Sequence, residues 1–146
     1  MNGKTTEQRI SLVTLGVADV AKARAFNERL GWTASSASMD EVVFFDMGGM
    51  IFGLYAQSEL SKDSGLTDQT PSPGGITLAY NTRSHEEVDH LMGVVEDAGA
   101  TVLKQPVEMP WGGYVGYFAD PDGHPWVISW VPQFPVLEDG RIEIPK

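Results

Sequence analysis

The sequence contains no cysteine, and this absence excludes several kinds of chemistry. A chain without thiols forms no disulfide bond, offers no thiolate nucleophile, and holds neither an iron–sulfur cluster nor a zinc ion through sulfur. Any metal site would therefore depend on histidine and carboxylate side chains. The lack of cysteine does not by itself identify the cellular compartment.

Basic residues are also few. Lys and Arg number 10 against 20 Asp and Glu, which gives a formal net charge of −10. Such a surface repels a phosphate backbone, so we expect no nucleic-acid partner. The excess of acid has two open interpretations: it keeps the protein soluble, or it attracts a cationic ligand toward a cleft. For the second interpretation, Glu41, Asp46 and Glu108 are the acidic residues in or near predicted strands.

Long apolar runs are missing as well. No apolar run reaches the roughly 18 residues that a membrane-spanning helix needs, and the first ten residues, MNGKTTEQRI, contain no long apolar segment. We therefore expect a cytoplasmic protein with no membrane partner. A hydrophobic content of 42% supports an ordinary core, and 146 residues fit one domain.

The two halves of the chain show the same order of predicted elements. In the first half, the apolar segment 10–17 predicts a strand, and Asp19 is placed to cap a helix that ends at Gly31. In the second half, Ser84 and Glu87 have the spacing of a capping box, which predicts the start of another helix. The other strands are predicted at 42–47, 50–56, 76–81, 101–107, 114–119 and 125–131.

This repetition divides a single domain, residues 1–146, into two modules. The boundaries are 8–56 for module one, 57–74 for a connector, 75–132 for module two and 133–146 for a tail. The connector is polar and rich in Ser, Thr, Pro and Gly, so it has no core of its own. In the tail, Asp139-Gly140 predicts a hairpin, either at an edge of its own chain or exchanged with a partner chain.

Two segments carry a resemblance to a known family: LVTLGVADVAKARAFNERLGW in the first module and YFADPDGHPW in the second. With the repeated order of elements, they make residues 8–132 resemble the vicinal oxygen chelate superfamily, the group of glyoxalases, bleomycin-resistance proteins and extradiol dioxygenases. The resemblance implies an α+β fold in which two repeated β-α-β-β-β modules form a curved, incompletely closed mixed sheet around a cup, with the helices outside. It also implies a homodimer.

Metal-binding members of this superfamily take their ligands from four strand positions, two in each module. The resemblance places these positions at Leu12, Phe52, Gly75 and Val127, and none of these side chains can donate a lone pair to a metal. A shift of one residue would introduce only Ser11 as an oxygen donor. We therefore expect no metal and no cofactor.

The cup that the resemblance implies would have an apolar lining with a few hydroxyl groups. Strand alternation around an inward Val127 turns Trp126 and Trp130 toward the helices. The expected cup-lining residues on strands are Leu12, Thr14, Phe52, Leu54, Thr77, Ala79, Val127 and Ser129. Trp111 lies in a Pro- and Gly-punctuated loop, where it would either close the mouth of the cup or form a dimer or loop contact.

These residues predict a metal-independent protein that holds a small apolar or aromatic ligand in the cup, with a cationic ligand left open. Tyr114 and His124 are also expected to line the cup. One alternative is therefore an enzyme of the same fold that works without the usual metal ligands, with His124, Tyr114 or a hydroxyl of the cup as acid or base. Another is a structural homologue whose cup has collapsed around Phe52 and Leu12. A cavity bounded by Leu12, Phe52, Thr77 and Val127 would separate the first hypothesis from the last.

Overall fold

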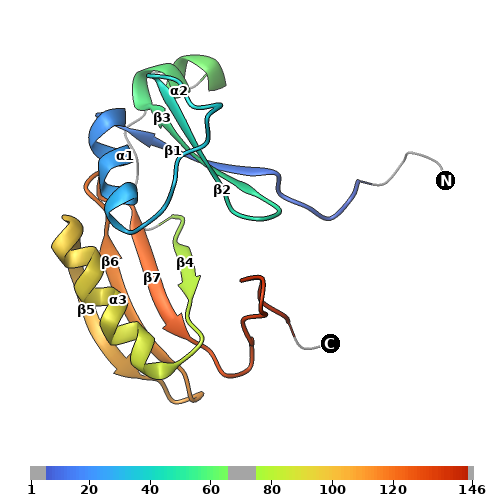
Figure 1. Ribbon diagram of the computed structural model, residues 1–146, viewed down its shortest axis with the longest axis vertical. Coiled ribbons are helices and arrows are strands. Elements are labelled where there is room, and N and C mark those ends of the chain that lie inside the picture. Colours follow the sequence, from blue (N-terminus) through green and yellow to red (C-terminus); the bar gives the residue numbers. More distant parts are fainter. Residues whose placement is uncertain (1–5, 66–74, 145–146) are drawn as a thin grey trace.

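The computed structural model describes residues 6–65 and 75–144, and within them it shows two mixed sheets and three helices (Figure 1). In chain order the elements are β1 (Leu12–Val17), α1 (Val20–Arg29), β2 (Val42–Asp46), β3 (Ile51–Ala56), α2 (Gln57–Ser64), β4 (Leu78–Asn81), α3 (His85–Ala98), β5 (Thr101–Glu108), β6 (Tyr114–Ala119) and β7 (Pro125–Trp130). The predicted α+β class and the repeated order of elements are confirmed.

Module one is a three-stranded sheet in the order β1-β3-β2, with α1 packed on one face. β1 runs parallel to β3, and β2 and β3 form an antiparallel hairpin. The helix begins as predicted, because the Asp19 side chain accepts a hydrogen bond from the backbone N–H of Lys22 at 3.1 Å. It ends before Gly31, whose positive φ of 98° suits glycine.

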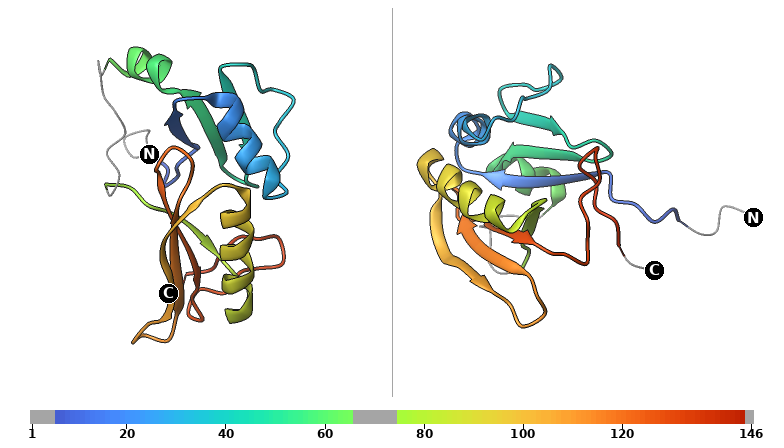
Figure 2. Two further views of the ribbon diagram at one scale, coloured as in Figure 1. Left: turned by 90° about the vertical axis from the view of Figure 1, so that its left-hand side faces the viewer. Right: turned by 60° about the horizontal axis from the view of Figure 1, so that its bottom comes forward.

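Module two is a four-stranded sheet in the order β4-β7-β6-β5, with α3 on one face. Ser84 Oγ accepts a hydrogen bond from the N–H of Glu87 at 3.2 Å, so the predicted N-cap is present. The Glu87 carboxylate accepts in turn from the N–H of Arg83 at 2.9 Å, one residue before the N–H that a standard capping box would use. The two helices α1 and α3 lie on the same side of the molecule, one above the other (Figure 2, left).

The first part of the predicted connector is a helix. β3 leads directly into α2, which packs on β1 and β3 and ends at Gly65 in the left-handed conformation. The Gln57 side chain of α2 lies so close to Gly16 that a Cβ there would overlap it. The predicted connector therefore begins with a helix at residues 57–64, of which only Ser61 is buried, while residues 66–74 lie outside the described part of the chain.

The predicted C-terminal hairpin is present as a single bridge between Val136 and Ile142. The N–H of Leu137 donates to the carbonyl of Arg141, and Gly140 takes a positive φ in the turn. The Arg83 guanidinium donates to the Leu137 carbonyl at 2.9 Å and so ties this tail to the start of α3. None of the helices in the described residues is long and apolar enough to cross a bilayer.

Aromatic side chains join the two modules. Trp32, just after α1, has its ring centroid 6.2 Å from that of Trp126 on β7. Phe52 on β3 lies 6.0 Å from Trp32 and 5.5 Å from Trp126, in both cases edge to face. Aromatic pairs attract at these distances and angles, beyond the contribution of the buried area. The core of the protein is therefore continuous from one module to the other.

The Asp-Pro-Asp-Gly-His turn between β6 and β7 adds polar contacts across the same boundary. The N–H of Ala18 donates to the Asp122 carboxylate at 2.9 Å. His124 Nε2 lies 2.8 Å from the carbonyl oxygen of Gly16, and because a carbonyl only accepts, Nε2 carries the proton. We call these two hydrogen bonds the inter-module contact. They bind the turn of module two to the junction of β1 and α1.

Asp120 organises the same turn from within. Its Oδ1 accepts hydrogen bonds from the N–H groups of Asp122 and His124, and its Oδ2 accepts one from the indole N–H of Trp126 at 3.2 Å. Burial raises the pKa of the Asp120 carboxyl, while these hydrogen bonds and the nearby His124 act in the opposite direction. The turn and the orientation of Trp126 are therefore coupled through one carboxyl group.

Replacing Ser84 with alanine should lower the free energy of unfolding by about 1 kcal/mol, because α3 loses its N-cap acceptor. Ser84→Asp retains an acceptor and should unfold close to the wild-type denaturant concentration. Urea unfolding of the three proteins measures the difference. Identical midpoints for Ser84→Ala and the wild type would show that the cap does not stabilise the helix.

Asp122→Ala should remove half of the inter-module contact and cost about 1 kcal/mol, whereas Asp122→Asn keeps an oxygen that can accept from Ala18. Hydrogen exchange provides a local readout: the amide of Ala18 should exchange faster in Asp122→Ala and near the wild-type rate in Asp122→Asn. Equal exchange of this amide in both variants would contradict the assigned hydrogen bond.

Candidate functional site

A cleft of about 570 Å³ lies between the two modules. It is formed by the β2–β3 hairpin and the segment after α1 from module one, by β4 and β7 from module two, and by the C-terminal tail. The lining residues are Val13, Trp32, Thr33, Phe45, Asp46, Met47, Gly48, Met50, Phe52, Leu78, Ala79, Tyr80, Trp126 and Asp139.

One wall of the cleft is aromatic because of the strand register. β2 and β3 place Phe45 directly opposite Phe52, and their ring centroids are 6.1 Å apart. Trp32 meets both rings edge to face, at 6.0 Å from each. Trp126 completes this wall from module two, with its orientation fixed by the hydrogen bond to Asp120.

The rim of the cleft carries two carboxylates with different environments. Asp139 forms an ion pair with Arg141, whose backbone N–H and guanidinium both donate hydrogen bonds to its carboxylate. These hydrogen bonds lower the pKa of Asp139. Asp46 accepts only the N–H of Gly48, at 2.8 Å, and within the described residues it forms no ion pair. Among residues 6–65 and 75–144, Arg9 lies nearby but pairs with Glu7, so Asp46 contributes to the rim a carboxylate without an ion-pair partner in this part of the chain.

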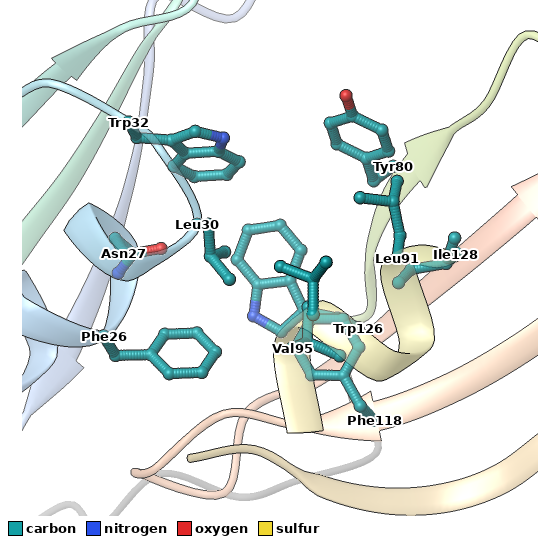
Figure 3. Close-up of a pocket in the computed structure, with 11 residues that line it drawn as sticks. Phe26, Asn27, Leu30, Trp32, Tyr80, Leu91, Val95, Phe118, Trp126 and Ile128 are labelled. Atoms are coloured by element: carbon teal, nitrogen blue, oxygen red, sulfur yellow. The ribbon is translucent and has the colours of Figure 1, made fainter. Parts of the chain in front are cut away.

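A second, smaller pocket of about 70 Å³ adjoins the cleft and lies between α1 and α3. The two pockets share Trp32, Tyr80 and Trp126 as walls. Figure 3 shows Trp32 and Tyr80 facing each other from the two modules, with Trp126 below them. The remaining walls of the smaller pocket are Phe26, Asn27, Leu30, Leu91, Val94, Val95, Phe118 and Ile128.

The structure corrects the expected cup lining in module one. The register pairs Val13 with Phe52, and Leu54 lies two residues further along β3, on the same face. These three side chains therefore share the face of the sheet that α1 covers. Leu12 and Thr14 point from the opposite, open face. The prediction that Phe52 and Leu54 share a surface with them is wrong: Leu54 is a core residue with 1% exposure, and Phe52 lines the inter-module cleft instead.

In module two the alternation is as expected. Trp126 pairs with Leu78 on the helix-covered face and is buried, which confirms its predicted orientation. Val127 and Ser129 point from the open face, and Thr77 lies exposed just before β4. Of the expected cup-lining residues on strands, Phe52 and Ala79 line the observed cleft, which opens between the modules. The others do not line it: Leu12, Thr14, Leu54, Thr77, Val127 and Ser129.

The other three expected cup-lining residues, Trp111, Tyr114 and His124, lie elsewhere. Trp111 is 47% exposed in the loop between β5 and β6, and its carbonyl accepts a hydrogen bond from Gln133. The Tyr114 hydroxyl donates to Asp89 at 2.8 Å, and this hydrogen bond raises the pKa of Tyr114. His124 belongs to the inter-module contact. None of the three lines the cleft, so neither acid–base candidate faces it.

His85, the first residue of α3, is partly buried. Its ring stacks on Tyr114 with the centroids 3.8 Å apart. Its Nε2 lies 2.7 Å from a carboxylate oxygen of Glu108. This small cluster fastens the start of α3 to the β5–β6 hairpin and lies outside the cleft.

The donor set of the described residues does not fit a divalent metal. In residues 6–65 and 75–144, no three His, Asp or Glu side chains converge on one point. On the open faces, the corrected register puts Ile51 opposite Leu12, and Val127 and Gly75 likewise offer no side-chain donor.

The sequence did contain signals for the cleft residues that the expected lining omitted. Trp32 belongs to the LGW segment used for the family resemblance, and Asp46 is one of the acidic strand residues noted above. Tyr80 lies in a predicted strand, in register with the core residue Ile128. What local patterns did not indicate is that these residues meet across the module boundary.

A family model described as the Glyoxalase/Bleomycin resistance protein/Dioxygenase superfamily matches residues 9–128. No curated protein matches the sequence. Among solved structures, a glyoxalase-related enzyme from Fulvimarina pelagi is 33% identical, with a TM-score of 0.88, over 96% of this chain and 100% of that one.

A glyoxalase/bleomycin resistance protein/dioxygenase family enzyme from Burkholderia phytofirmans PsJN is 26% identical, with a TM-score of 0.76, over 83% of this chain and 97% of that one. A lactoylglutathione lyase from Agrobacterium tumefaciens shares the fold at 22% identity and a TM-score of 0.67, over 87% of this chain and 96% of that one. Because the family model spans most of its length, this chain belongs to the Glyoxalase/Bleomycin resistance protein/Dioxygenase superfamily.

Proposed function

We propose that this chain is a metal-independent binding protein that holds a small aromatic or apolar molecule, bearing a positive charge, in the cleft between its modules. The observation that carries the proposal is the combination of an aromatic wall with the unbalanced carboxylate of Asp46. The volume of about 570 Å³ lies within the range of ordinary ligand pockets. This cleft is not the cavity bounded by Leu12, Phe52, Thr77 and Val127 that the sequence predicts, since only Phe52 of these residues lines it. An open cleft of this size between the modules nevertheless favours ligand binding over the alternative of a collapsed, purely structural homologue.

The positive charge of the ligand is inferred from the cleft chemistry. Trp and Tyr rings attract cations through their π faces, and Trp32, Tyr80 and Trp126 all line the cleft. Asp46 adds a carboxylate at the rim, and the net charge of −10 favours the approach of a cation from a distance. An anionic ligand would meet none of these attractions.

The proposal needs no metal, since the aromatic wall and one carboxylate supply the attraction. It also favours binding over catalysis. His124 and Tyr114, the acid–base candidates, are engaged with Gly16 and Asp89 away from the cleft. The ionisable groups that do line the cleft are Asp46, Asp139 and Tyr80.

The benzyltrimethylammonium ion is a suitable probe, because it combines an aromatic ring with a permanent positive charge. Titration followed by calorimetry should show binding to the wild-type protein, before and after treatment with EDTA. Asp46→Asn should weaken binding about fivefold, which corresponds to a loss on the order of 1 kcal/mol for a partly exposed charge pair. Trp32→Leu should weaken it by a similar factor through the lost cation–π contact.

The matched control is Asp40→Asn, which removes an equal charge from an exposed position outside the cleft. If Asp40→Asn weakens binding as much as Asp46→Asn, only the overall charge matters and the cleft assignment is wrong. Binding that disappears with EDTA would contradict metal independence, and turnover of the bound molecule would favour the enzyme alternative.

We also propose that the chain forms a homodimer through the open faces of its sheets. Leu12 and Ile51 are register partners on the open face of module one and are 46% and 37% exposed. Ile10 and Ile76 are exposed immediately before β1 and β4. Apolar side chains gathered in this way favour contact with a second copy of the chain.

Light scattering at micromolar concentration should give twice the chain mass of 15.9 kDa. Leu12→Glu should shift the protein toward the monomer, because a charge would be buried at the proposed interface. Met39→Glu, at an exposed apolar position in the loop before β2, should leave the mass unchanged. A wild-type mass of about 16 kDa would contradict the dimer.

A further inference from the structure

The smaller pocket contains a buried side chain with an unused acceptor. Asn27, on the last turn of α1, is 5% exposed. Its Nδ2 donates to the carbonyl of Ala23 at 2.9 Å, which fixes the orientation of the amide, because that carbonyl can only accept. Its Oδ1 accepts no hydrogen bond from any residue in 6–65 or 75–144.

This oxygen is accessible from the pocket. Among the described residues, every fully buried side-chain nitrogen or oxygen has a hydrogen-bond partner. Since Oδ1 of Asn27 has no such partner, it is not fully buried and must border open space. Figure 3 shows it pointing from α1 toward the pocket interior, between the rings of Phe26 and Trp32. Most of the wall around it is apolar, with Leu30, Val95 and Phe118 among its members.

A single buried acceptor in an apolar pocket matches one kind of occupant. Ordered buried water is typically held by two to four polar partners, and Asn27 offers one acceptor. An apolar group with one donor would instead satisfy the acceptor and fill the pocket. The volume of about 70 Å³ corresponds to roughly five to seven water-sized units, which is close to the size of a phenol.

We propose that the smaller pocket is a subsite for an uncharged apolar group carrying one hydroxyl or N–H donor, with Asn27 Oδ1 as the acceptor that selects it. The subsite opens next to the cleft, since Trp32, Tyr80 and Trp126 line both. The proposal deepens the proposed function and rests on it: the same ligand places its cationic part in the cleft and its neutral donor in the subsite.

The test compares phenol with fluorobenzene, a ring of similar size without a donor. Binding is followed by NMR through the indole N–H signals of Trp32 and Trp126 and the side-chain amide signal of Asn27. The wild type should bind both probes. Asn27→Leu keeps the volume and removes the acceptor, so phenol should bind about five- to tenfold more weakly while fluorobenzene binds within about twofold of wild type.

Fluorobenzene binding also reports that the Asn27→Leu pocket is intact. Val94→Phe fills the pocket and should abolish binding of both probes, which locates them there. Equal phenol affinity in Asn27→Leu and wild type would overturn the proposal, as would equal weakening of both probes or no binding of either to the wild type.

The benzyltrimethylammonium titration keeps the two proposals apart. This ion should still bind to Val94→Phe, since Val94 does not line the cleft. If the ion binds the wild type while phenol does not, the subsite is wrong and the cleft assignment stands. If phenol binds as expected and the ion does not, the cationic part of the proposed function is wrong.

Discussion

The contact between Trp32 and Trp126 shapes both pockets between the modules. The two rings come from different modules, lie 6.2 Å apart between centroids, and both touch Phe52. Tilted and edge-on aromatic contacts are favourable. Both pockets have these two tryptophans as walls, so the shape of each pocket depends on this contact.

Polar groups hold the aromatic contact in position at some cost. Asp120 fixes Trp126 through the indole N–H and supports the turn that reaches module one through Asp122 and His124. Its raised pKa shows that burial of this carboxylate opposes ionisation more strongly than its hydrogen bonds favour it. The Asp-Pro-Asp-Gly-His segment therefore does more than reverse the chain, since it also sets how the two modules face each other.

The fold could be predicted further than the site, for reasons visible in particular residues. The helix caps at Asp19 and Ser84 depend on hydrogen bonds across three residues, and strand alternation has a period of two residues. Both features can therefore be recognised in a short stretch of sequence. β3 has apolar residues on both faces, among them Ile51 and Phe52, and alternation alone cannot tell which of them faces the helix. The cleft depends on Trp32 meeting Trp126, far apart in sequence, which no local pattern records. α2 was missed because its sequence is polar and only Ser61 is buried.

The rim of the cleft and the smaller pocket differ in polarity, and this difference limits which kind of ligand could occupy both. At the open rim, the side chain of Asp46 is exposed to water, whereas that of Asp139 is paired with Arg141. Deeper between the helices, a carboxylate would pay a large desolvation penalty, and the polar side chain found there is the neutral amide of Asn27. A ligand with its charge at one end and a neutral donor at the other can satisfy both groups in only one orientation. The reverse orientation would bury the charge in the smaller pocket, whose lining contains no carboxylate to balance it.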